Sequence, residues 1–187
     1  MPTNPCLQSL YDAIEALPEG YTGELIAGRL YTHPRPAGPR ALAASSLGGE
    51  LHGPFQRGRG GPGGWWIIDE PEVHFVRNVE VAVPDLAGWR RERMARVPDD
   101  QRFEIVPDWI CEIASPSTAR HDREIKLPRY ASFGVPHVWL IDPVSGELEV
   151  FALEGDGYAI VAAVAGDAEI RQPPFEDVAI EPPWIEV

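Results

Sequence analysis

The sequence predicts an α/β (α+β) fold in which helices flank a central mixed β-sheet. Residues 107–143 have the pattern of a strand, a turn, a helix and a second strand. A chain of 187 residues is long enough for one domain with a full core and too short for two. We therefore expect a single domain over residues 1–187, with its core at about 20–164 and a peripheral, proline-rich acidic tail at 165–187. Short runs of β-branched and aromatic residues predict three further strands, meandering antiparallel, at 65–69, 73–76 and 79–83.

The first 55 residues are predicted to contain two helices and a hairpin. Apolar residues at helical spacing indicate a helix over 7–17, and the Pro-Glu-Gly sequence that follows ends it. Residues 24–32 predict an N-terminal hairpin that turns near Gly28. After a proline-rich link, an apolar stripe predicts a second helix over 40–55.

Two arginine-containing segments lie outside the predicted strands. The glycine-rich segment 57–64 is typical of a loop between elements, although an RGG-type nucleic-acid segment or a mobile lid would need the same residues. Residues 90–96 form the one basic cluster, in a loop or short helix. Such a cluster is either a solvated surface segment or one that contacts phosphates.

The central segment begins with a strand over 109–114 whose composition suits burial on both faces. Glu112 lies in its middle, where a carboxylate costs several kcal/mol unless it has a partner or a metal ion. The turn 115–118 supplies hydroxyls for the N-cap of the following helix, and Gly134 ends that helix. Pro128 predicts a kink, or a restart of the helix with the proline in its first turn. The remaining strands are predicted at 138–141 and, as a C-terminal hairpin, at 147–153 and 158–164.

Lys126 is the only lysine among sixteen basic residues. It follows Asp122 and precedes Tyr130 by four residues each, so the three share one face of the predicted helix. A lone lysine against fifteen arginines indicates a site that needs a compact ammonium. A surface pair between Asp122 and Lys126 explains the same residues equally well.

The formal net charge of −13 argues against non-specific, charge-driven binding to nucleic acid. Most of this charge belongs to residues 142–187, where eleven acidic groups and one arginine give −10, against −3 for the rest. No stretch approaches the roughly 18 apolar residues of a membrane span, and the N-terminus lacks secretory features. We therefore expect a cytoplasmic protein with no membrane partner. Cys6 and Cys111 lack zinc-binding spacing, which predicts reduced thiols and no structural zinc.

Two carboxylates and the lysine form the candidate catalytic site. Asp85 follows the third predicted strand, and Glu112 lies in the central strand. Two carboxylates can hold Mg²⁺ or Mn²⁺ and leave positions for water and a phosphate oxygen. A lysine beside the ion can orient or deprotonate the attacking water and offset the developing charge. The sequence therefore indicates Asp85 and Glu112 as metal ligands and Lys126 as the third catalytic residue.

Other polar residues are weaker candidates. Asp108 shares a strand face with Glu112 and is either a further ligand or a turn residue. His121 is near the predicted site, but no HxH or HExxH pattern exists, so no histidine is assigned to the metal. Possible outer ligands are Glu24, Glu50, Glu70 and Glu72. Possible phosphate contacts or supporting groups are Ser115, Ser117, Thr118 and Asp122, together with the amides at the helix N-terminus.

A specific set of motifs resembles a known family. They are Pro84-Asp85, Glu112 followed by Ser-Pro-Ser-Thr, Asp122, Lys126, Tyr130, Gly134-Val135 and the sequence Val-Trp-Leu-Ile-Asp-Pro at 138–143. These residues resemble the Uma-type family of putative restriction endonucleases, formerly a domain of unknown function, within the PD-(D/E)XK nuclease superfamily. The resemblance runs from the hairpin at Glu24 to about Val164.

The resemblance implies a restriction-endonuclease-like core with Asp85 and Glu112 as metal ligands, DNA as a partner and a homodimer. The superfamily signature places its lysine two residues after the glutamate, where this chain has Ala114. The family resemblance places the lysine on the following helix, at Lys126.

Three functions remain open from the sequence. A metal-dependent DNA endonuclease that hydrolyses phosphodiester bonds is favoured by the motifs. A non-catalytic regulatory or protein-interaction module on the same fold is favoured by the acidic C-terminal part. A hydrolase of a small phosphorylated substrate would need no DNA-sized basic face. A positive groove near Arg57, Arg59 and the cluster at 90–96 would distinguish the endonuclease from the small-molecule hydrolase.

Overall fold

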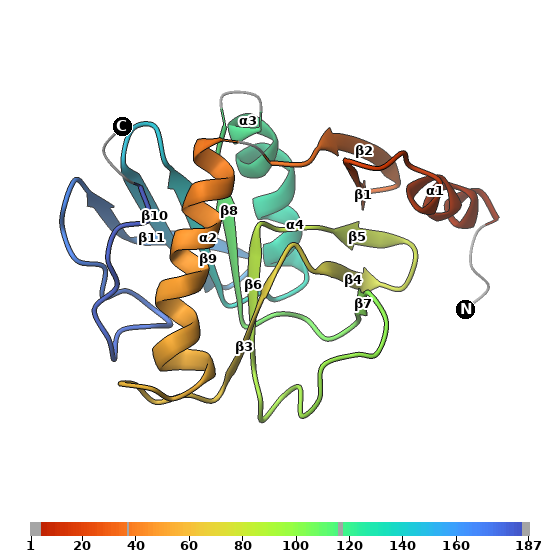
Figure 1. Ribbon diagram of the computed structural model, residues 1–187. Coiled ribbons are helices and arrows are strands. Elements are labelled where there is room, and N and C mark those ends of the chain that lie inside the picture. Colours follow the sequence, from red (N-terminus) through yellow and green to blue (C-terminus); the bar gives the residue numbers. More distant parts are fainter. Residues whose placement is uncertain (1–4, 37, 116–117, 185–187) are drawn as a thin grey trace.

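The computed structural model describes residues 5–36, 38–115 and 118–184, and its strands form two neighbouring mixed sheets (Figure 1). The smaller sheet has the order β2 (Arg29–Pro34), β1 (Tyr21–Ile26), β5 (Glu80–Ala82), β4 (Glu72–Val76) and β7 (Arg102–Phe103). The larger sheet has the order β11 (Gly157–Ala165), β10 (Glu147–Glu154), β9 (His137–Asp142), β8 (Trp109–Ile113), β6 (Leu86–Arg90) and β3 (Trp65–Asp69).

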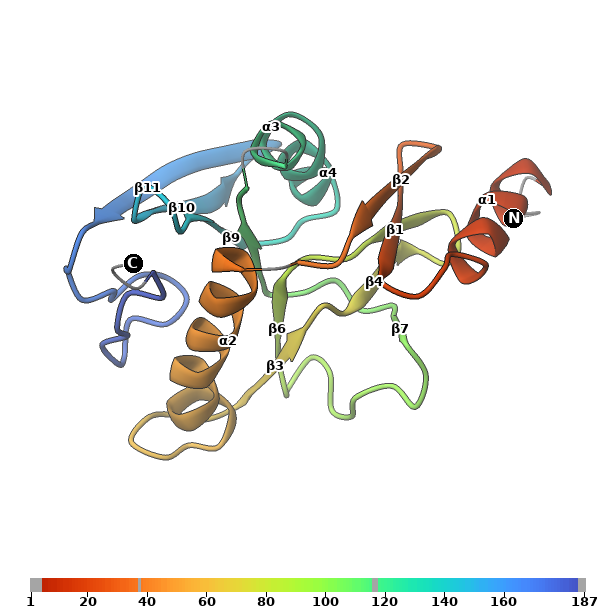
Figure 2. The same ribbon diagram turned by 45° about the horizontal axis from the view of Figure 1, so that its top comes forward.

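Helices cover both faces of the larger sheet (Figure 2). On one face lies α2 (Pro39–Leu51), which continues into the π-helical turn η1 (His52–Gln56). On the other face lies one helical segment made of α3 (Ala119–His121), the π-helical turn η2 (Asp122–Lys126) and α4 (Leu127–Ser132). This segment connects β8 to the parallel strand β9, the arrangement typical of α/β folds. Helix α1 (Pro5–Glu15) packs beside β1 in the smaller sheet.

The alternation along β8 decides which residues face which helix. Trp109, Cys111 and Ile113 belong to the apolar cluster that contains the buried residues of α2. Ile110 belongs to the cluster that contains Leu127 and Tyr130 of α4. Because side chains alternate along a strand, Glu112 projects toward the α4 face.

The mixed α/β fold and most predicted elements are confirmed. The first helix, both hairpins, the central strand and the helix after it lie close to their predicted positions. The N-terminal hairpin turns at Ala27 and Gly28, which both have positive φ, as a type I′ turn requires. The predicted restart at Pro128 also holds, since Pro128 lies in the first turn of α4. Just before Pro128, the N–H of Leu127 donates a hydrogen bond to the carbonyl of Asp122 in a π-helical turn. This wider turn accommodates a proline, which has no N–H to donate.

Three expectations about the strands are corrected. Strand β3 does not continue the antiparallel meander, because it pairs with β6 in the larger sheet, whereas β4 and β5 do pair antiparallel. Residues 86–90 form a strand, β6, so Asp85 precedes a strand and Arg90 ends it. The segment 98–104, which we expected to be a polar connector, contains the two-residue strand β7.

Strand β6 was not evident in the sequence because its residues suit a strand only in this packing. It contains Gly88 and no β-branched residue, a composition with low strand propensity. A Cβ atom at Gly88 would lie 3.2 Å from side-chain atoms of Ile67, Trp65 and Trp109. The glycine therefore lets three large neighbouring side chains close over the strand.

The C-terminal segment is not peripheral, which corrects the expectation for residues 165–187. Phe175 is fully buried, and its ring centroid lies 4.7 to 5.7 Å from those of four aromatic residues, Phe55, Trp65, Trp109 and Trp139. The indole N–H of Trp139 donates a hydrogen bond to the carbonyl of Pro173 at 2.7 Å. Residues 170–180 therefore complete the core on the α2 face.

Two remaining observations concern the expected environment of the chain. None of the helices within the described ranges has the length and apolar character needed to cross a membrane. Cys111 is a buried free thiol in β8.

Candidate functional site

The candidate site lies where the chain passes from the smaller sheet to the larger one. Between β5 and β6 the chain runs through Val83, Pro84 and Asp85. The antiparallel register of β6 and β8 pairs Leu86 with Cys111, so its continuation places Asp85 across from Glu112. The amide of Ile113 donates a hydrogen bond to Oδ2 of Asp85 at 2.7 Å. The two predicted metal ligands are therefore close neighbours.

Lys126 enters the same site from the helical segment. Its Nζ lies 2.7 Å from Oε1 of Glu112 and 2.9 Å from Oε1 of Glu24. All three side chains are at most 3% exposed. One turn along the helix, the hydroxyl of Tyr130 also donates a hydrogen bond to Oε1 of Glu112. The surface pair considered for Lys126 is excluded, because the ammonium is buried between two glutamates.

The N-terminal hairpin supplies Glu24. The backbone N–H of Val83 donates a hydrogen bond to its Oε1 at 2.8 Å, which fixes the carboxylate against the strand crossing. Of the four possible outer ligands named from the sequence, Glu24 is the one that contacts Lys126.

Arg40, at the N-terminal end of α2, holds the carboxylate of Asp85. Its Nε lies 2.9 Å from Oδ1 and its Nη2 lies 3.1 Å from Oδ2. Such a two-point pair between a guanidinium and a carboxylate is strong and directional. Nothing in the sequence around Arg40 indicated this contact, because it depends on how α2 packs on the sheet.

The buried charges of the site do not balance. Four carboxylates, those of Glu24, Asp85, Glu112 and Asp122, are at most 3% exposed. The cations that face them are Lys126 and Arg40. With every acidic group ionised, the cluster therefore carries two negative charges in excess.

The pKa values reflect this imbalance. Burial raises the pKa of Glu112 to about 8, with Lys126 opposing the shift and the nearby carboxylates adding to it. Burial also raises the pKa of Asp122. For Glu24, burial acts in the same direction, but the charge and hydrogen bond of Lys126 and the hydrogen bond from Val83 help to lower the pKa to about 2. Two of the four carboxylates therefore lack sufficient positive charge around them.

Unpartnered oxygens occur at the same two residues. Oε2 of Glu112 and Oδ2 of Asp122 are buried and have no hydrogen-bond partner within the described parts of the chain. Buried polar atoms normally have partners, and each exception needs an explanation. Oxygen atoms of ionised carboxylates are the ligands that hard divalent cations prefer. The donor set and its charge therefore fit a divalent ion such as Mg²⁺ or Mn²⁺.

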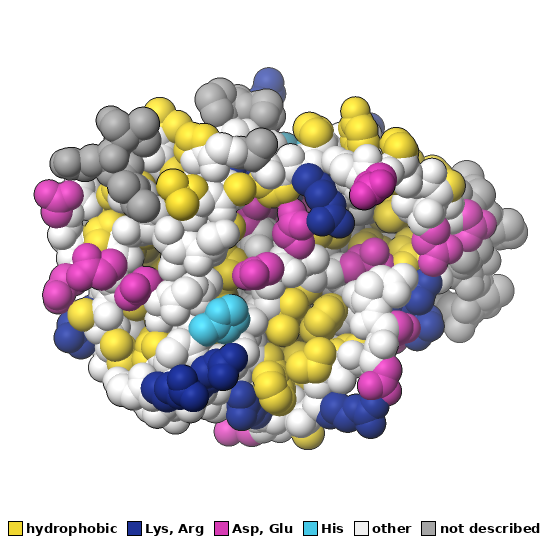
Figure 3. All heavy atoms as spheres, in the orientation of Figure 1, with side chains coloured by type: hydrophobic (Ala, Val, Ile, Leu, Met, Phe, Trp, Pro, Cys, Tyr) yellow, Lys and Arg dark blue, Asp and Glu magenta, His cyan; other side chains and the backbone are white. Residues whose placement is uncertain are grey.

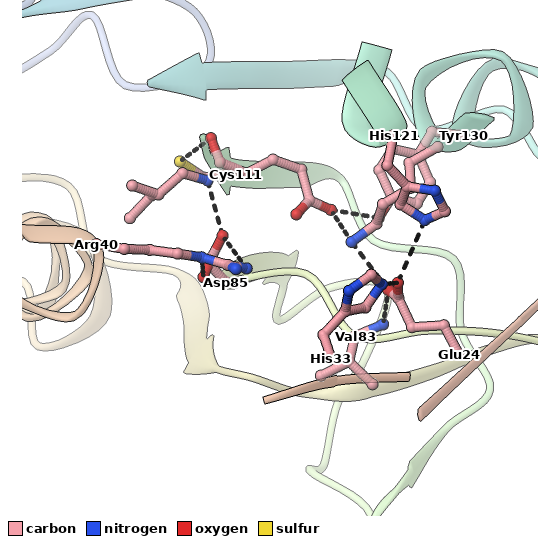
Figure 4. Close-up of polar contacts among 11 residues, drawn as sticks. Glu24, His33, Arg40, Val83, Asp85, Cys111, His121 and Tyr130 are labelled. Carbon is pink, nitrogen blue, oxygen red and sulfur yellow. Dashed lines mark hydrogen bonds and ion pairs between the residues drawn. The ribbon is translucent and has the colours of Figure 1, made fainter. Parts of the chain in front are cut away.

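Two histidines also reach the site, although the sequence led us to assign none. Nε2 of His121 lies 3.7 Å from Oε2 of Glu24, and Nε2 of His33 lies 3.8 Å from the same oxygen (Figure 4). His121 was noted as near the site, whereas His33 was missed. The hairpin register could have found it, because His33 pairs with Thr22, which shares a strand face with Glu24.

Several predicted residues lie elsewhere. Asp108 is at the far end of β8, where Oδ1 accepts a hydrogen bond from Arg93 at 2.6 Å and Oδ2 accepts one from the amide of Arg90 at 2.8 Å. Glu72 binds Tyr11 and His74 in the smaller sheet. Glu50 is exposed on α2, whereas Glu70 lines the cavity beside the site.

The turn before the helix does not cap it as expected. Thr118 is the N-cap residue, but its side chain makes no capping hydrogen bond. Instead, Oγ1 of Thr118 accepts a hydrogen bond from the amide of Ser115 at 3.1 Å and lies 3.1 Å from the Ser115 hydroxyl. Thr118 also lines the cavity. Ser117 lies outside the described residues.

The arginine cluster at 90–96 does not border the carboxylates. Asp85 precedes β6 and Arg90 ends it, so at about 3.3 Å per residue the two lie on the order of 15 Å apart. Arg91 stacks over Trp66 at 3.9 Å from its ring centroid, and Arg93 pairs with Asp108. On the face shown in Figure 3, several basic side chains lie along the lower rim and acidic ones are scattered across the centre.

Comparisons with known proteins agree with the fold. The model of the Uma2 family, described as "Putative restriction endonuclease", matches residues 9–182. The chain is similar to the crystal structure of a putative nuclease belonging to DUF820 from Anabaena variabilis, with a TM-score of 0.70 and 22% sequence identity over 90% of this chain and 93% of that one. At this identity the likeness shows the fold. The comparison with curated proteins found no match. Because the family model matches nearly the whole chain, this protein belongs to the Uma2 family.

Proposed function

We propose that this protein is a metal-dependent endonuclease that hydrolyses phosphodiester bonds of DNA. The observation that carries the proposal is the convergence of Asp85, Glu112 and Lys126 from three separate elements into one buried site with excess negative charge. The family description supports nuclease activity and DNA as the substrate.

Asp85 and Glu112 would hold the ion, with Asp122 supporting it. The unpartnered oxygens of Glu112 and Asp122 and the uncompensated charge favour a divalent cation in this position. When bound, Mg²⁺ or Mn²⁺ supplies a polarised water and stabilises charge on the phosphoryl oxygens. Asp85 can bind the ion only if Arg40 shares or releases the Asp85 carboxylate, since the guanidinium contacts both of its oxygens.

Lys126 is better suited to donate hydrogen bonds than to remove a proton. Burial alone would lower its pKa, but the charges of Glu112, Glu24 and Asp122 raise it. The ammonium therefore stays protonated at neutral pH, and we assign it to orienting the attacking water and offsetting charge on the phosphate. Tyr130 positions Glu112 through the hydrogen bond that its hydroxyl donates to Oε1 of Glu112. Glu24 positions Lys126 through their ion pair.

Contacts with the DNA backbone would come from exposed arginines near the helical segment. Arg120, Arg123 and Arg35 have side chains that are 85%, 52% and 66% exposed. Arginine side chains bind phosphates through planar, two-point contacts. A homodimer would place two such sites on one duplex, as cleavage of both strands requires.

The test is plasmid nicking in Mg²⁺ or Mn²⁺, together with calorimetric titration of the ion. Asp85→Asn and Glu112→Gln are expected to lose nicking and to weaken ion binding. Asp108→Asn is the matched control, because Asp108 is a buried carboxylate at the other end of the same strand. Nicking that persists in Glu112→Gln would overturn the proposal.

The same samples separate the two other functions. Hydrolysis of bis(p-nitrophenyl) phosphate without nicking of DNA would indicate a small phosphorylated substrate. A folded wild-type protein that neither binds the ion nor hydrolyses either substrate would indicate a non-catalytic module. The acidic C-terminal part and the distance of the arginine cluster from the site are the features that favour these alternatives.

A further inference from the structure

The imidazoles of His33 and His121 are directed at a single oxygen of Glu24. Their Nε2 atoms lie 3.8 and 3.7 Å from Oε2, and the three ligand atoms all lie within 4.8 Å of one another. In Figure 4 both rings approach the Glu24 carboxylate. His33 comes from β2 and His121 from α3, two segments far apart in the sequence.

These contacts are too long to be hydrogen bonds. A hydrogen bond between a charged imidazole and a carboxylate would bring the two atoms to about 2.8 Å. Instead, Nε2 of His33 and Nε2 of His121 are buried and find no hydrogen-bond partner among the residues that the structure describes. Two orphaned nitrogens and one carboxylate oxygen thus surround a space without bonding across it.

We propose that Glu24, His33 and His121 form a second cation site, separate from the carboxylate site, which binds a divalent transition metal of the Zn²⁺ and Co²⁺ class. Ligands held about 2.1 Å from a tetrahedral ion lie about 3.4 Å from one another. The distances of 3.7 and 3.8 Å would need to shorten by only a few tenths of an ångström.

The ligand types separate this site from the Mg²⁺ site. Imidazole nitrogen binds transition metals well, whereas Mg²⁺ is bound through oxygen ligands. Oε1 of Glu24 is already engaged by Lys126 and Val83, which leaves Oε2 on the histidine side.

The surroundings of the three ligands provide both rigidity and space. The ring of Tyr31 packs on His121 with centroids 4.5 Å apart, and the two histidine rings lie 5.4 Å apart. The three residues border a cavity of about 30 Å³ that Arg40, Asp85, Asp122 and Lys126 of the carboxylate site also line, so the two cation sites are adjacent. Such a volume holds one water-sized group. Three protein ligands with one open position are typical of a zinc site that binds water or an anion.

The test is titration of the full-length protein with Co²⁺, followed by visible d–d absorption. The wild type is expected to bind one Co²⁺ with the spectrum of a nitrogen-ligated ion, and Zn²⁺ but not Mg²⁺ should displace it. His33→Gln and His121→Gln should each weaken Co²⁺ binding by at least ~10-fold, by analogy with the loss of groups that support metal ligands. His137→Gln is the control. His137 is another half-buried histidine, at the first position of β9 beside Trp109, and this variant should bind Co²⁺ normally.

Asp85→Asn separates the two sites, since it should keep the Co²⁺ spectrum even if it abolishes nicking. Proton NMR of the Co²⁺-loaded wild type gives a second readout that needs no variant, with two contact-shifted imidazole N–H signals expected. Unchanged Co²⁺ binding in both glutamine variants would overturn the proposal. So would a wild-type complex without histidine signals, or one that Mg²⁺ displaces and Asp85→Asn abolishes.

Discussion

Arg40 occupies both oxygens of Asp85, with Nε at 2.9 Å from Oδ1 and Nη2 at 3.1 Å from Oδ2. The guanidinium thus takes the position that a cation would need on this carboxylate. The side chain of Asp85 is 1% exposed and that of Arg40 is 19% exposed, so the pair is largely shielded from solvent. Arg40 and a bound metal ion are therefore expected to compete for Asp85.

Replacing Arg40 with glutamine should destabilise the metal-free protein and increase its response to Mg²⁺. Loss of the counter-charge from a buried carboxylate costs roughly 3 kcal/mol, and an ion that binds only the folded state restores stability. The measurement is thermal unfolding with and without Mg²⁺. Arg35→Gln, which alters an exposed arginine lining a cavity beside Asp85, is the control. A smaller Mg²⁺-induced shift in Arg40→Gln than in the wild type would show that Arg40 supports the ion.

Lys126→Met should lower the free energy of unfolding by roughly 3 to 5 kcal/mol, because it leaves two buried carboxylates without their shared cation. Urea denaturation measures this loss. Adding Glu112→Gln should recover part of it, since the double variant removes one of the two buried acidic groups that Lys126 had bonded. Arg123→Gln, on the surface of the same helical segment, should change the stability by less than about 0.5 kcal/mol. If the losses in unfolding free energy of Lys126→Met and Glu112→Gln simply added in the double variant, the two residues would not be energetically coupled.

The metal-free protein should lose stability as the pH rises from about 4.5 to about 8. Burial raises the pKa of Glu112 from 4.5 to about 8, so in this window the folded protein holds a proton that the unfolded chain has released. Stability falls with pH wherever the folded state binds more protons. Glu24, with its pKa lowered from 4.5 to about 2, contributes a slope of the opposite sign, but this slope lies below pH 4.5 and fades just above it. Urea denaturation across this window is the measurement, and Glu112→Gln should show a shallower slope.

Mg²⁺ binding should release close to one proton below pH 8, since the ion must displace the proton held by Glu112. Calorimetric titration in buffers that differ in ionisation enthalpy measures the number of protons released when the ion binds. The release should disappear in Glu112→Gln and remain in Asp108→Asn. Equal release from the wild type and Glu112→Gln would assign the proton to another group.

Phe175→Ala should destabilise the protein by about 3 to 5 kcal/mol. The ring is fully buried among four aromatic side chains, and its removal leaves a cavity that these neighbours cannot fill. Val144→Ala is the control, because Val144 is 76% exposed. If the two variants unfold at the same urea concentration, the C-terminal segment does not contribute to the core as described.

The sequence predicted those features that depend on neighbours along the chain. Residues 109–113 combine strand-forming residues with a buried carboxylate, and the structure has them as the fully buried strand β8. The spacing of Asp122, Lys126 and Tyr130 placed them on one helix face, and all three are buried toward Glu112. The sequence also paired Asp85 with Glu112 as metal ligands, a pair that the family resemblance implied as well, and the two residues lie across from each other.

The features that the sequence did not predict depend on contacts between distant segments. Strand β6 forms because Gly88 leaves room for large side chains from β3 and β8. The preference of this segment for a strand conformation is therefore set by the neighbouring strands. His33 reaches Glu24 only through the register of the hairpin, and Arg40 reaches Asp85 only through the packing of α2. In each case the residue type was visible, but its partner lies on another element.

The position of Phe175 also bears on how the protein is made. Translation proceeds from the N-terminus, so Trp109 and Trp139 are synthesised before Phe175. Until then, the aromatic pocket that these residues form around Phe175 has no occupant. A nascent chain, or a product of premature termination before this residue, thus exposes an unfinished aromatic surface to chaperones and proteases. The core beneath the sheet that carries Glu112 is therefore completed only after Phe175 has been synthesised.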